Sequence, residues 1–506
     1  MKLAVIATLL GALLGASAAI QTAAQAQTHL RIGLSEDPDS FDPTPGNSYV
    51  GRIVFMSLCD KLLDADKKTQ LVPMLATEWS WGEDLRSVTL KLRQGVKFQD
   101  GEPFDAEATK FTLERHLTQP DSRRKSEIQQ IKSVEVIDPH TVKLNLEVPF
   151  VALLAQLADR AGIMVSPKAA KALGPNFGQK PVCAGPYNLV ERVPQDRIVL
   201  ERFPGYWDKD KIFIDKITFL PIVDDQARIA SLQTGQQDMI ERLPAADVDR
   251  IKKDSRLKFY GTVSLAYTGI TFDTDLNEGA KIPINRDKRI RQALELSIDR
   301  DAINQAVFNG LALPGNQWQS PESPWFVKSV PIPKRDVAKA KALLAEAGQP
   351  NPSFTMLVPN GGEVTRVAEV VQAMAQEAGF NIKLQVAEFQ TSLQRAYKGD
   401  FEAFLIGWSG RVDPDGNIHV FNHCGGAQNY GGYCRPEMDK LLDEARTKPT
   451  MAERYAVYEK VMRLEAEELP RIYLYHPQWL FASTTRLSGF EAYPDGLIRP
   501  QGLKLN

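Results

Sequence analysis

The sequence lacks two features that would place it in common functional classes. It has no excess of one charge, because 61 lysines and arginines are balanced by 63 aspartates and glutamates, for a formal net charge of −2. The basic field that nucleic-acid binding needs is therefore missing. Beyond the first 26 residues, no apolar run is long enough to cross a bilayer. We expect no nucleic-acid partner and no membrane-spanning helix in the mature chain.

Motifs of familiar enzymes are also absent or incomplete. There is no G-x-G-x-x-G and no phosphate-binding loop, and the six histidines include none in a context that marks a catalytic base. The segment 407–411 misses the G-x-S-x-G nucleophile motif by one position. We therefore predict that the protein is not an enzyme, and keep a secreted hydrolase as an alternative.

The first 26 residues have the layout of a secretory signal peptide. A positive start at Lys2 precedes an apolar run over 3–14, and small residues lead to an A-x-A pattern ending at Ala26. The apolar run is roughly a dozen residues, too short for a membrane-spanning helix. No cysteine lies at the cleavage site, so a lipid anchor is not expected. We predict cleavage after Ala26 and a soluble, exported protein.

Four cysteines in an exported protein predict disulfide bonds, with three pairings open. Cys424 and Cys434 flank a Gly-rich stretch that can bring its ends together, so we pair them. The remaining two, Cys59 and Cys183, lie more than a hundred residues apart. For these, a bridge and two buried free thiols are equally weighted alternatives.

The mature chain, about 480 residues long, is large enough for two or three domains. Strand-like alternation occurs in the first half, as at 29–34 and 87–93. After Thr271, long amphipathic helices such as 288–308 and 363–378 alternate with short strands. This alternation is typical of an α/β domain.

Several short motifs follow one another in a definite order. They are L-V-P-M-L-A-T-E-W at 71–79, L-R-Q-G-V-K-F-Q-D-G-E-P-F at 92–104, G-P-Y at 185–187, D-R-I-V-L-E-R-F-P-G-Y-W at 196–207, and R-I-R-Q-A-L at 289–294 with I-D-R at 298–300. Each alone is ordinary strand, turn or helix sequence. Together, from about Leu30 to the C-terminus, they resemble the peptide/nickel/opine family of extracytoplasmic solute-binding proteins, which serve ABC-type importers.

The resemblance implies an α/β, two-lobed periplasmic binding protein fold of the large peptide-binding type, which closes on its ligand about a hinge. Crossings near Tyr267 and His476 would form the hinge. The expected boundaries are 1–26 for the signal peptide, 27–50, 181–267 and 477–506 for lobe I, 51–180 for a subdomain inserted in lobe I, and 268–476 for lobe II.

The function implied by the resemblance is capture of a short peptide or peptide-like ligand and its delivery to the membrane permease of an ABC importer. We expect a periplasmic monomer without a cofactor. A metal or metal-chelate binding protein of the nickel type is the alternative from another class.

The segment 407–417 is the main candidate for ligand contact, since it combines an aromatic ring, two glycines and charges of both signs. In peptide-binding proteins that it resembles, the equivalent segment supplies a carboxylate for the α-ammonium group. Here Arg411 stands where dipeptide binders carry Asp, and Asp413 is the next carboxylate. A guanidinium at this point favours a carboxylate on the ligand. The alternative is that Arg411 pairs internally with Asp413 or Asp415.

The same resemblance supplies the remaining ligand-site candidates. The alternative for the aromatic residues among them is packed core or surface, where Tyr and Trp occur more often than as ligand contacts. The full set is Ser35, Glu36 and Asp37 from the first lobe, Tyr267, Thr268 and Gly269 near the hinge, Trp318 in the second lobe, and Trp408, Ser409, Gly410, Arg411 and Asp413 in the main segment.

His419 and His423 are candidate metal ligands, because histidines at positions i and i+4 can share one face of a helix. Cys424 would be the third ligand, but it has a disulfide partner in Cys434, and the region has the pattern of a loop. A calcium loop starting at Asp413 is excluded, because Ile418 and Cys424 replace the required Gly and Glu. We predict no metal site here.

Overall fold

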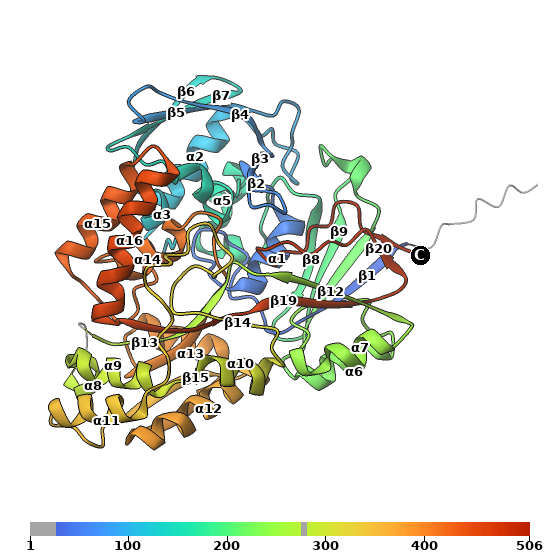
Figure 1. Ribbon diagram of the computed structural model, residues 1–506. Helices are drawn as coiled ribbons and strands as arrows, with labels where there is room; N and C mark the ends of the chain where they lie inside the picture. Colours follow the sequence, from blue (N-terminus) through green and yellow to red (C-terminus); the bar gives the residue numbers. More distant parts are fainter. Residues whose placement is uncertain (1–26, 275–280) are drawn as a thin grey trace, which may run out of the picture.

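The computed structural model describes residues 27–274 and 281–506, so the predicted signal peptide at 1–26 lies outside the described residues. The chain forms a mixed α/β structure around two large sheets (Figure 1). The predicted fold class is therefore confirmed. Among the described residues, no helix is both long enough and apolar enough to cross a bilayer.

The first large sheet has the strand order β12-β19-β11-β1-β10-β9-β8. Its strands are β1 (His29–Leu34), β8 (Tyr187–Val193), β9 (Arg197–Arg202), β10 (Lys216–Pro221), β11 (Met239–Ile240), β12 (Leu257–Val263) and β19 (Gln478–Thr484). The central strand β1 runs parallel to β10 and β11, and the predicted strand at 29–34 matches it. Associated helices are α1 (Tyr49–Leu58), α6 (Asp225–Gln233) and α7 (Val248–Lys253).

The second large sheet has the order β14-β18-β13-β17-β15-β16. Its strands are β13 (Tyr267–Phe272), β14 (Leu313–Pro314), β15 (Ser353–Pro359), β16 (Asn381–Ala387), β17 (Ala403–Trp408) and β18 (Arg471–His476). The helices of this part of the chain are α8 (Pro283–Arg286), α9 (Lys288–Ser297), α10 (Arg300–Phe308), α11 (Val337–Glu346), α12 (Gly362–Ala378), α13 (Phe389–Tyr397), α14 (Asp415–Asn422), α15 (Pro436–Thr447) and α16 (Met451–Glu468). β13 is buried along its whole length.

A smaller antiparallel sheet, β4-β5-β7-β6, has its own hydrophobic core. Its strands are β4 (Ala76–Trp81), β5 (Ser87–Leu92), β6 (Ile131–Asp138) and β7 (Thr141–Leu146). The helices near it are α2 (Ala106–Thr118), α3 (Lys125–Ile128), α4 (Leu153–Gln156) and α5 (Pro167–Leu173). Two further sheets have two strands each, β2 (Leu63–Ala65) with β3 (Leu71–Pro73), and β20 (Leu487–Ser488) with β21 (Lys504–Leu505). Figure 1 shows the sheet β4-β5-β7-β6 at the top of the molecule, away from α11 and α12.

The chain passes between the two large sheets at two neighbouring points. β12 ends at Val263 and β13 begins at Tyr267, while β18 ends at His476 and β19 begins at Gln478. The two crossings are hydrogen-bonded to each other, because Ser264 donates to the carbonyl of Pro477 and His476 Nδ1 donates to that of Ala266 (2.9 Å). The lobe boundaries expected from the sequence stay a prediction.

The predicted single helix over 288–308 is wrong, since α9 and α10 are separate. Asp299 has an extended backbone (φ −102°, ψ 104°), and its side chain accepts a hydrogen bond from Ala302 N as the N-cap of α10. A capping aspartate thus starts a second helix within the segment whose apolar residues predict one continuous helix. The predicted loop at 419–424 is also wrong, because 419–422 belongs to α14.

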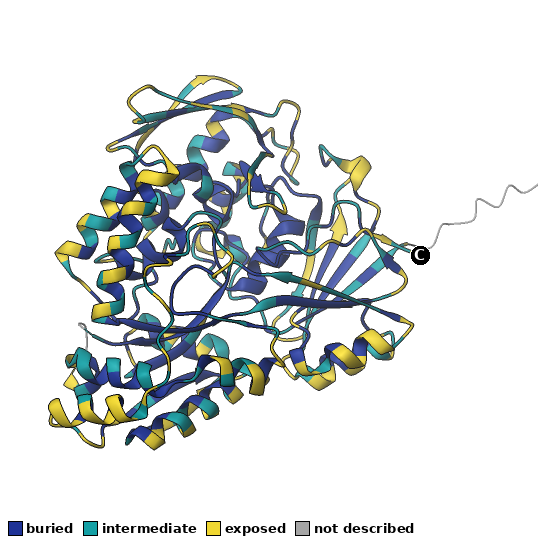
Figure 2. Cartoon of the chain, viewed as in Figure 1, coloured by how far each residue is buried: buried dark blue, intermediate teal, exposed yellow. Residues whose placement is uncertain are grey.

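The predicted Cys424–Cys434 bond is present, with a Cα–Cα distance of 4.7 Å. Of the two alternatives for Cys59 and Cys183, the structure contains the bridge, with a Cα–Cα distance of 4.9 Å. The free-thiol alternative is thereby excluded. Figure 2 shows buried residues on the strands and on the inner faces of the helices, and exposed residues on the outer faces of α11 and α12. This is the pattern expected of amphipathic helices that cover a sheet.

Candidate functional site

A cavity of about 500 Å³ lies between the two large sheets. Its walls come from chain segments that belong to or adjoin each of the two large sheets. The loop after β1, the segment after β11 and the start of β19 line one side, while β13, the N-terminus of α12 and the end of β17 line the other. Chain segments far apart in the sequence therefore meet around one enclosed space, as expected for a ligand site.

The structure divides the predicted ligand-site residues into two groups. Those that line the cavity are Ser35, Glu36, Asp37, Tyr267, Thr268, Trp408 and Ser409. Those outside its lining are Gly269, Gly410, Arg411, Asp413 and Trp318. Ligand contact stays a prediction for the first group, and the placement of the second group differs from the expectation.

Arg411 is buried, with a side chain only 5% exposed. Its Nε lies 3.2 Å from Asp159 Oδ2, and its guanidinium stacks 4.2 Å above the Trp408 ring. Arg52 also pairs with Asp159 and donates to Ser409 Oγ (3.1 Å). Burial raises the pKa of Asp159, but the nearby Arg411 and Arg52 outweigh it and hold that pKa well below its usual range. Arg411 thus belongs to an ion-pair cluster behind the cavity wall.

The internal partners predicted for Arg411 are also different. Both oxygens of Asp413 accept hydrogen bonds from Arg454, at 2.6 and 2.7 Å. Asp415 pairs in the same way with Arg446, at 2.6 and 3.0 Å. Each carboxylate therefore already has a bidentate guanidinium partner from α15 or α16.

Packing explains why three other candidates lie outside the lining. Gly269 lies within β13, where an added Cβ would come within 2.7 Å of the carbonyl of Ile472. Gly410 has φ +80°, and a Cβ there would lie 2.2 Å from the carbonyl of Leu265. Trp318 is fully buried, 5.2 Å from the ring of Tyr458. These residues form the scaffold of the site.

Arg242, which the sequence analysis did not single out, lines the cavity directly after β11. Its side chain is 42% exposed, and its closest carboxylate oxygen among the ion pairs is Glu241 Oε2, 3.8 Å from Nε. The guanidinium lies over Tyr49 and Trp479 (5.0 and 5.9 Å), whose rings stack on each other at 4.4 Å. Within the described residues, this guanidinium donates no hydrogen bond, so all its donors are available to a ligand.

Glu36 is a carboxylate of the cavity lining that burial affects strongly. It is 7% exposed, and its Oε1 has no hydrogen-bond partner among the described residues. Burial raises its pKa to about 7, with Arg242 acting in the opposite direction. The cavity therefore places a guanidinium and an acid group within electrostatic range of each other.

Side chains also connect the two walls directly. Glu363, at the start of α12, accepts a hydrogen bond from Ala245 N (2.9 Å), and Gln390 donates to the carbonyl of Asp37 (3.3 Å). Asn47 donates to the Tyr397 hydroxyl (2.6 Å). The structure therefore shows the two walls in contact around the cavity.

Comparison with known proteins adds a family and several relatives. The family model described as "Bacterial extracellular solute-binding proteins, family 5 Middle" matches residues 70–429. The glutathione-binding protein GsiB of Pectobacterium atrosepticum is 31% identical over 474 residues, which cover 91% of this chain and 90% of GsiB. GsiB of Escherichia coli is 29% identical over 493 residues, 95% of each chain.

Solved structures share the same fold. The PBP AgaA of A. tumefaciens, in complex with agropinic acid, superposes with a TM-score of 0.85 at 26% identity, covering 94% of this chain and 99% of AgaA. A dipeptide-binding protein of Pseudoalteromonas sp., in complex with Met-Leu, has a TM-score of 0.86 at 23% identity, covering 94% of this chain and all of the other.

Proposed function

Because the chain belongs to the bacterial extracellular solute-binding proteins of family 5, we propose that it captures a short peptide or peptide-like ligand carrying a carboxylate. The ligand would then be delivered to the membrane permease of an ABC importer. Family members are solute-binding proteins rather than enzymes. The hydrolase alternative is therefore set aside.

The observation that carries this proposal is the position of Arg242 in the cavity. Its guanidinium is exposed to the cavity and donates no hydrogen bond within the described residues. A carboxylate accepts two parallel hydrogen bonds from such a fork. The names of two relatives include glutathione and agropinic acid, both of which are carboxylate compounds. In this proposal Arg242 has the role that the sequence analysis expected of Arg411.

Glu36 provides the complementary charge for a ligand ammonium group. It lines the same cavity as Arg242, and one of its oxygens has no partner among the described residues. A zwitterionic ligand placed between the two groups would satisfy both. Trp408 and Tyr267 line the second wall, but their side chains are buried, so they would supply mainly main-chain polar groups.

The mechanism proposed is closure of two lobes about the crossings at 264–266 and Pro477. Lobe I would hold the first large sheet and the inserted subdomain 51–180, and lobe II would hold residues 268–476. A ligand that contacts both walls stabilises the closed state through its higher affinity for that state. We further propose cleavage after Ala26 and action as a monomer in the periplasm.

The test is calorimetric titration of the mature chain, residues 27–506, with glutathione, unmodified tripeptides, C-terminally amidated peptides and N-acetylated peptides. The proposal predicts binding of at least one ligand with a free carboxylate and a weaker complex after amidation. Ligand at about 100 times its Kd adds about 2.7 kcal/mol to the stability, so thermal unfolding provides a second readout. Equal affinity for amidated and free peptides would overturn the proposed role of the carboxylate.

A further inference from the structure

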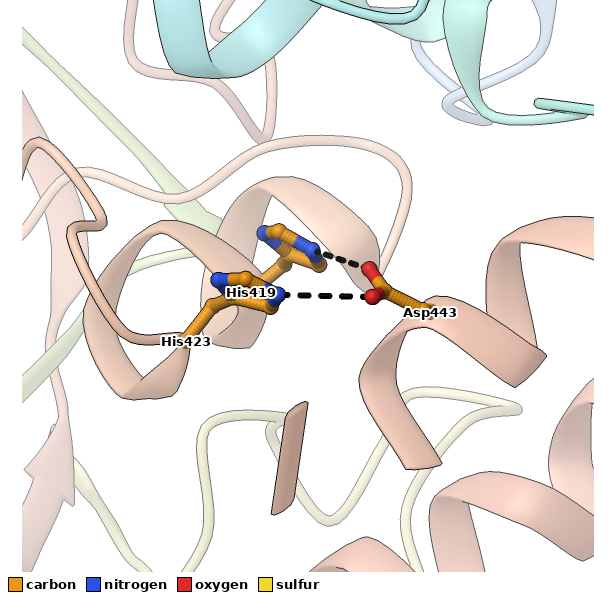
Figure 3. A group of neighbouring side chains, drawn as sticks. All are labelled: His419, His423 and Asp443. Atoms are coloured by element: carbon orange, nitrogen blue, oxygen red, sulfur yellow. Dashed lines mark hydrogen bonds and ion pairs between the residues drawn. The ribbon is translucent and has the colours of Figure 1, made fainter. Parts of the chain in front are cut away.

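A second cluster of chemically active side chains lies outside the cavity, between α14 and α15. It consists of His419, His423 and Asp443, which Figure 3 shows with both imidazoles facing the same carboxylate. His419 Nε2 lies 3.2 Å from Asp443 Oδ1, and His423 Nε2 lies 3.4 Å from Asp443 Oδ2. None of the three residues lines the cavity.

The helix brings the two histidines together. Positions i and i+4 lie on one face of α14 and its C-cap, so the rings stack with centroids 4.5 Å apart and an interplanar angle of 12°. The ligand atoms of the three residues all lie within 4.8 Å of one another. Ligands about 2.1 Å from a tetrahedral ion are about 3.4 Å apart, which matches the nitrogen–oxygen distances here.

The tautomer of His423 strengthens this interpretation. Its Nδ1 donates to the carbonyl of Cys424 (2.8 Å), so in the neutral ring the lone pair of Nε2 points at a carboxylate oxygen. The structure records this contact as a hydrogen bond, and a metal ion would take the place of the proton between the two atoms. A backbone carbonyl bonded to the far ring nitrogen is the usual support of a metal-bound histidine.

Neighbouring residues hold this support in place. Asp439, one turn before Asp443 on α15, accepts a hydrogen bond from Cys424 N (2.9 Å). Cys424 is itself fixed by its disulfide bond to Cys434. The nearest guanidinium on α15, that of Arg446, is neutralised by its ion pair with Asp415. The cluster is therefore supported on several sides.

We propose that His419, His423 and Asp443 bind one divalent transition-metal ion, such as Zn²⁺ or Ni²⁺, and clamp α14 to α15. Imidazole nitrogens with a carboxylate oxygen suit these ions. Asp443 is 56% exposed, so water can complete the coordination from that side. The site goes beyond the proposed function and does not depend on it, since the cavity and the cluster share no residue.

The sequence argues against a metal site here, because Cys424, the expected third ligand, has a disulfide partner in Cys434 and the region has the pattern of a loop. Cys424 is bonded to Cys434, as expected, but Asp443 takes the third position from another helix. This ligand is 20 residues further along the chain than His423. Its contribution therefore becomes visible only in the folded structure.

The experiment is titration of untagged, chelator-stripped mature protein with Zn²⁺ and with Ni²⁺, followed by calorimetry and thermal unfolding. The proposal predicts one tight site per chain and a rise in Tm that chelator reverses. His423→Gln and Asp443→Asn each weaken that site at least 30-fold. Glu444→Gln is the matched control, because this neighbour on α15 pairs with Lys448 and lies outside the cluster, so its affinity stays within twofold of wild type.

Two results would overturn the proposal. One is that the wild-type chain binds neither ion below millimolar concentration. The other is that the His423 and Asp443 variants bind as tightly as Glu444→Gln, which would place the ion elsewhere. Arg242→Ala must keep the metal affinity of wild type, so a failure of the ligand proposal and a failure of the metal proposal remain distinguishable.

Discussion

Arg411 and Arg242 both lie near the cavity, but their surroundings differ in every respect that matters for binding. Arg411 is 5% exposed and pairs with Asp159. Arg242 is 42% exposed and donates no hydrogen bond among the described residues, with its ion-pair partner Glu241 at 3.8 Å. The pKa of Asp159 is held well below its usual range, while that of Glu36, beside Arg242, is raised to about 7. The comparison teaches that a paired guanidinium stabilises the fold and that an unsatisfied one is available to a ligand.

The largest expected effect is on protein stability and tests the buried arginine, Arg411. Arg411→Ala removes one partner of a buried ion pair, a change that costs 3–5 kcal/mol in general. Asp159 keeps Arg52, so we expect the lower end, about 3 kcal/mol, in the free energy of unfolding measured with urea. Arg463→Ala, at a 56% exposed pair with Glu459, is the control and should cost about 0.5 kcal/mol or less. Unchanged stability together with lost ligand affinity would show that Arg411 contacts the ligand.

Arg242→Ala tests the exposed arginine of the comparison, through its effect on ligand affinity. Loss of charge-assisted hydrogen bonds to a ligand carboxylate should weaken binding about 10- to 100-fold in calorimetry. The free energy of unfolding should fall by about 1 kcal/mol, less than for Arg411→Ala, because the guanidinium also makes a 3.8 Å ion pair with Glu241 and lies over the Tyr49 ring. Arg242→Lys should restore only part of the affinity, because lysine lacks the bidentate fork. Equal affinity of all three proteins would contradict the comparison.

Glu36 should make ligand binding depend on pH. Its pKa is raised to about 7 by burial, so the free protein holds this proton below pH 7 and must release it to pair with a ligand ammonium. Affinity should therefore fall about tenfold from pH 8 to pH 6. Glu36→Gln should bind more weakly and show a flat profile. A wild-type profile equally flat between pH 6 and 8 would argue against Glu36 as the ammonium partner.

The same shift affects the stability of the ligand-free protein with the opposite sign. Because the folded-state pKa is raised from 4.5 to about 7, Glu36 contributes stability below pH 4.5 that is lost as the pH rises through 7. Urea unfolding at pH 5 and pH 8 should show a smaller decrease for Glu36→Gln than for wild type. An identical decrease in both proteins would assign the effect to other groups, such as Glu363, whose pKa burial also raises to about 7.

The smallest effect concerns the ring beneath Arg242. Tyr49→Leu removes an aromatic face 5.0 Å from the guanidinium, an interaction worth about 0.5–1 kcal/mol. Ligand affinity should fall about two- to fivefold. Tyr49→Phe keeps the ring and loses only the hydrogen bond to the carbonyl of Gly496, so its affinity should stay close to wild type. Equal losses in both variants would show that the hydroxyl, not the ring, positions Arg242.

The sequence predicted the family, the α/β class and the Cys424–Cys434 bond, because these depend on ordered motifs, on periodicity and on two cysteines that flank a short Gly-rich loop. For Cys59 and Cys183 it left a bridge and two free thiols as equal alternatives. It could not predict the partner of Arg411. Asp159 lies in a distant part of the chain and reaches Arg411 only when the fold is complete. No local pattern indicates such a contact.

The cavity position of Arg242 could not be predicted from the sequence either. It follows the two-residue strand β11, with φ 47°, and nothing around it marks a binding residue. The sequence at 419–424 has the pattern of a loop, whereas the structure places residues 415–422 in α14. Both cases depend on tertiary contacts that outweigh local preference.

The most direct test of the account is a binding cycle that combines Arg242→Ala with a ligand lacking its carboxylate. Calorimetry would measure four affinities, those of wild type and variant for a tripeptide and for its C-terminal amide. We predict that amidation weakens binding to wild type at least tenfold and leaves binding to Arg242→Ala unchanged. Equal weakening in both proteins would show that the carboxylate is bound elsewhere, and would contradict the assignment of Arg242.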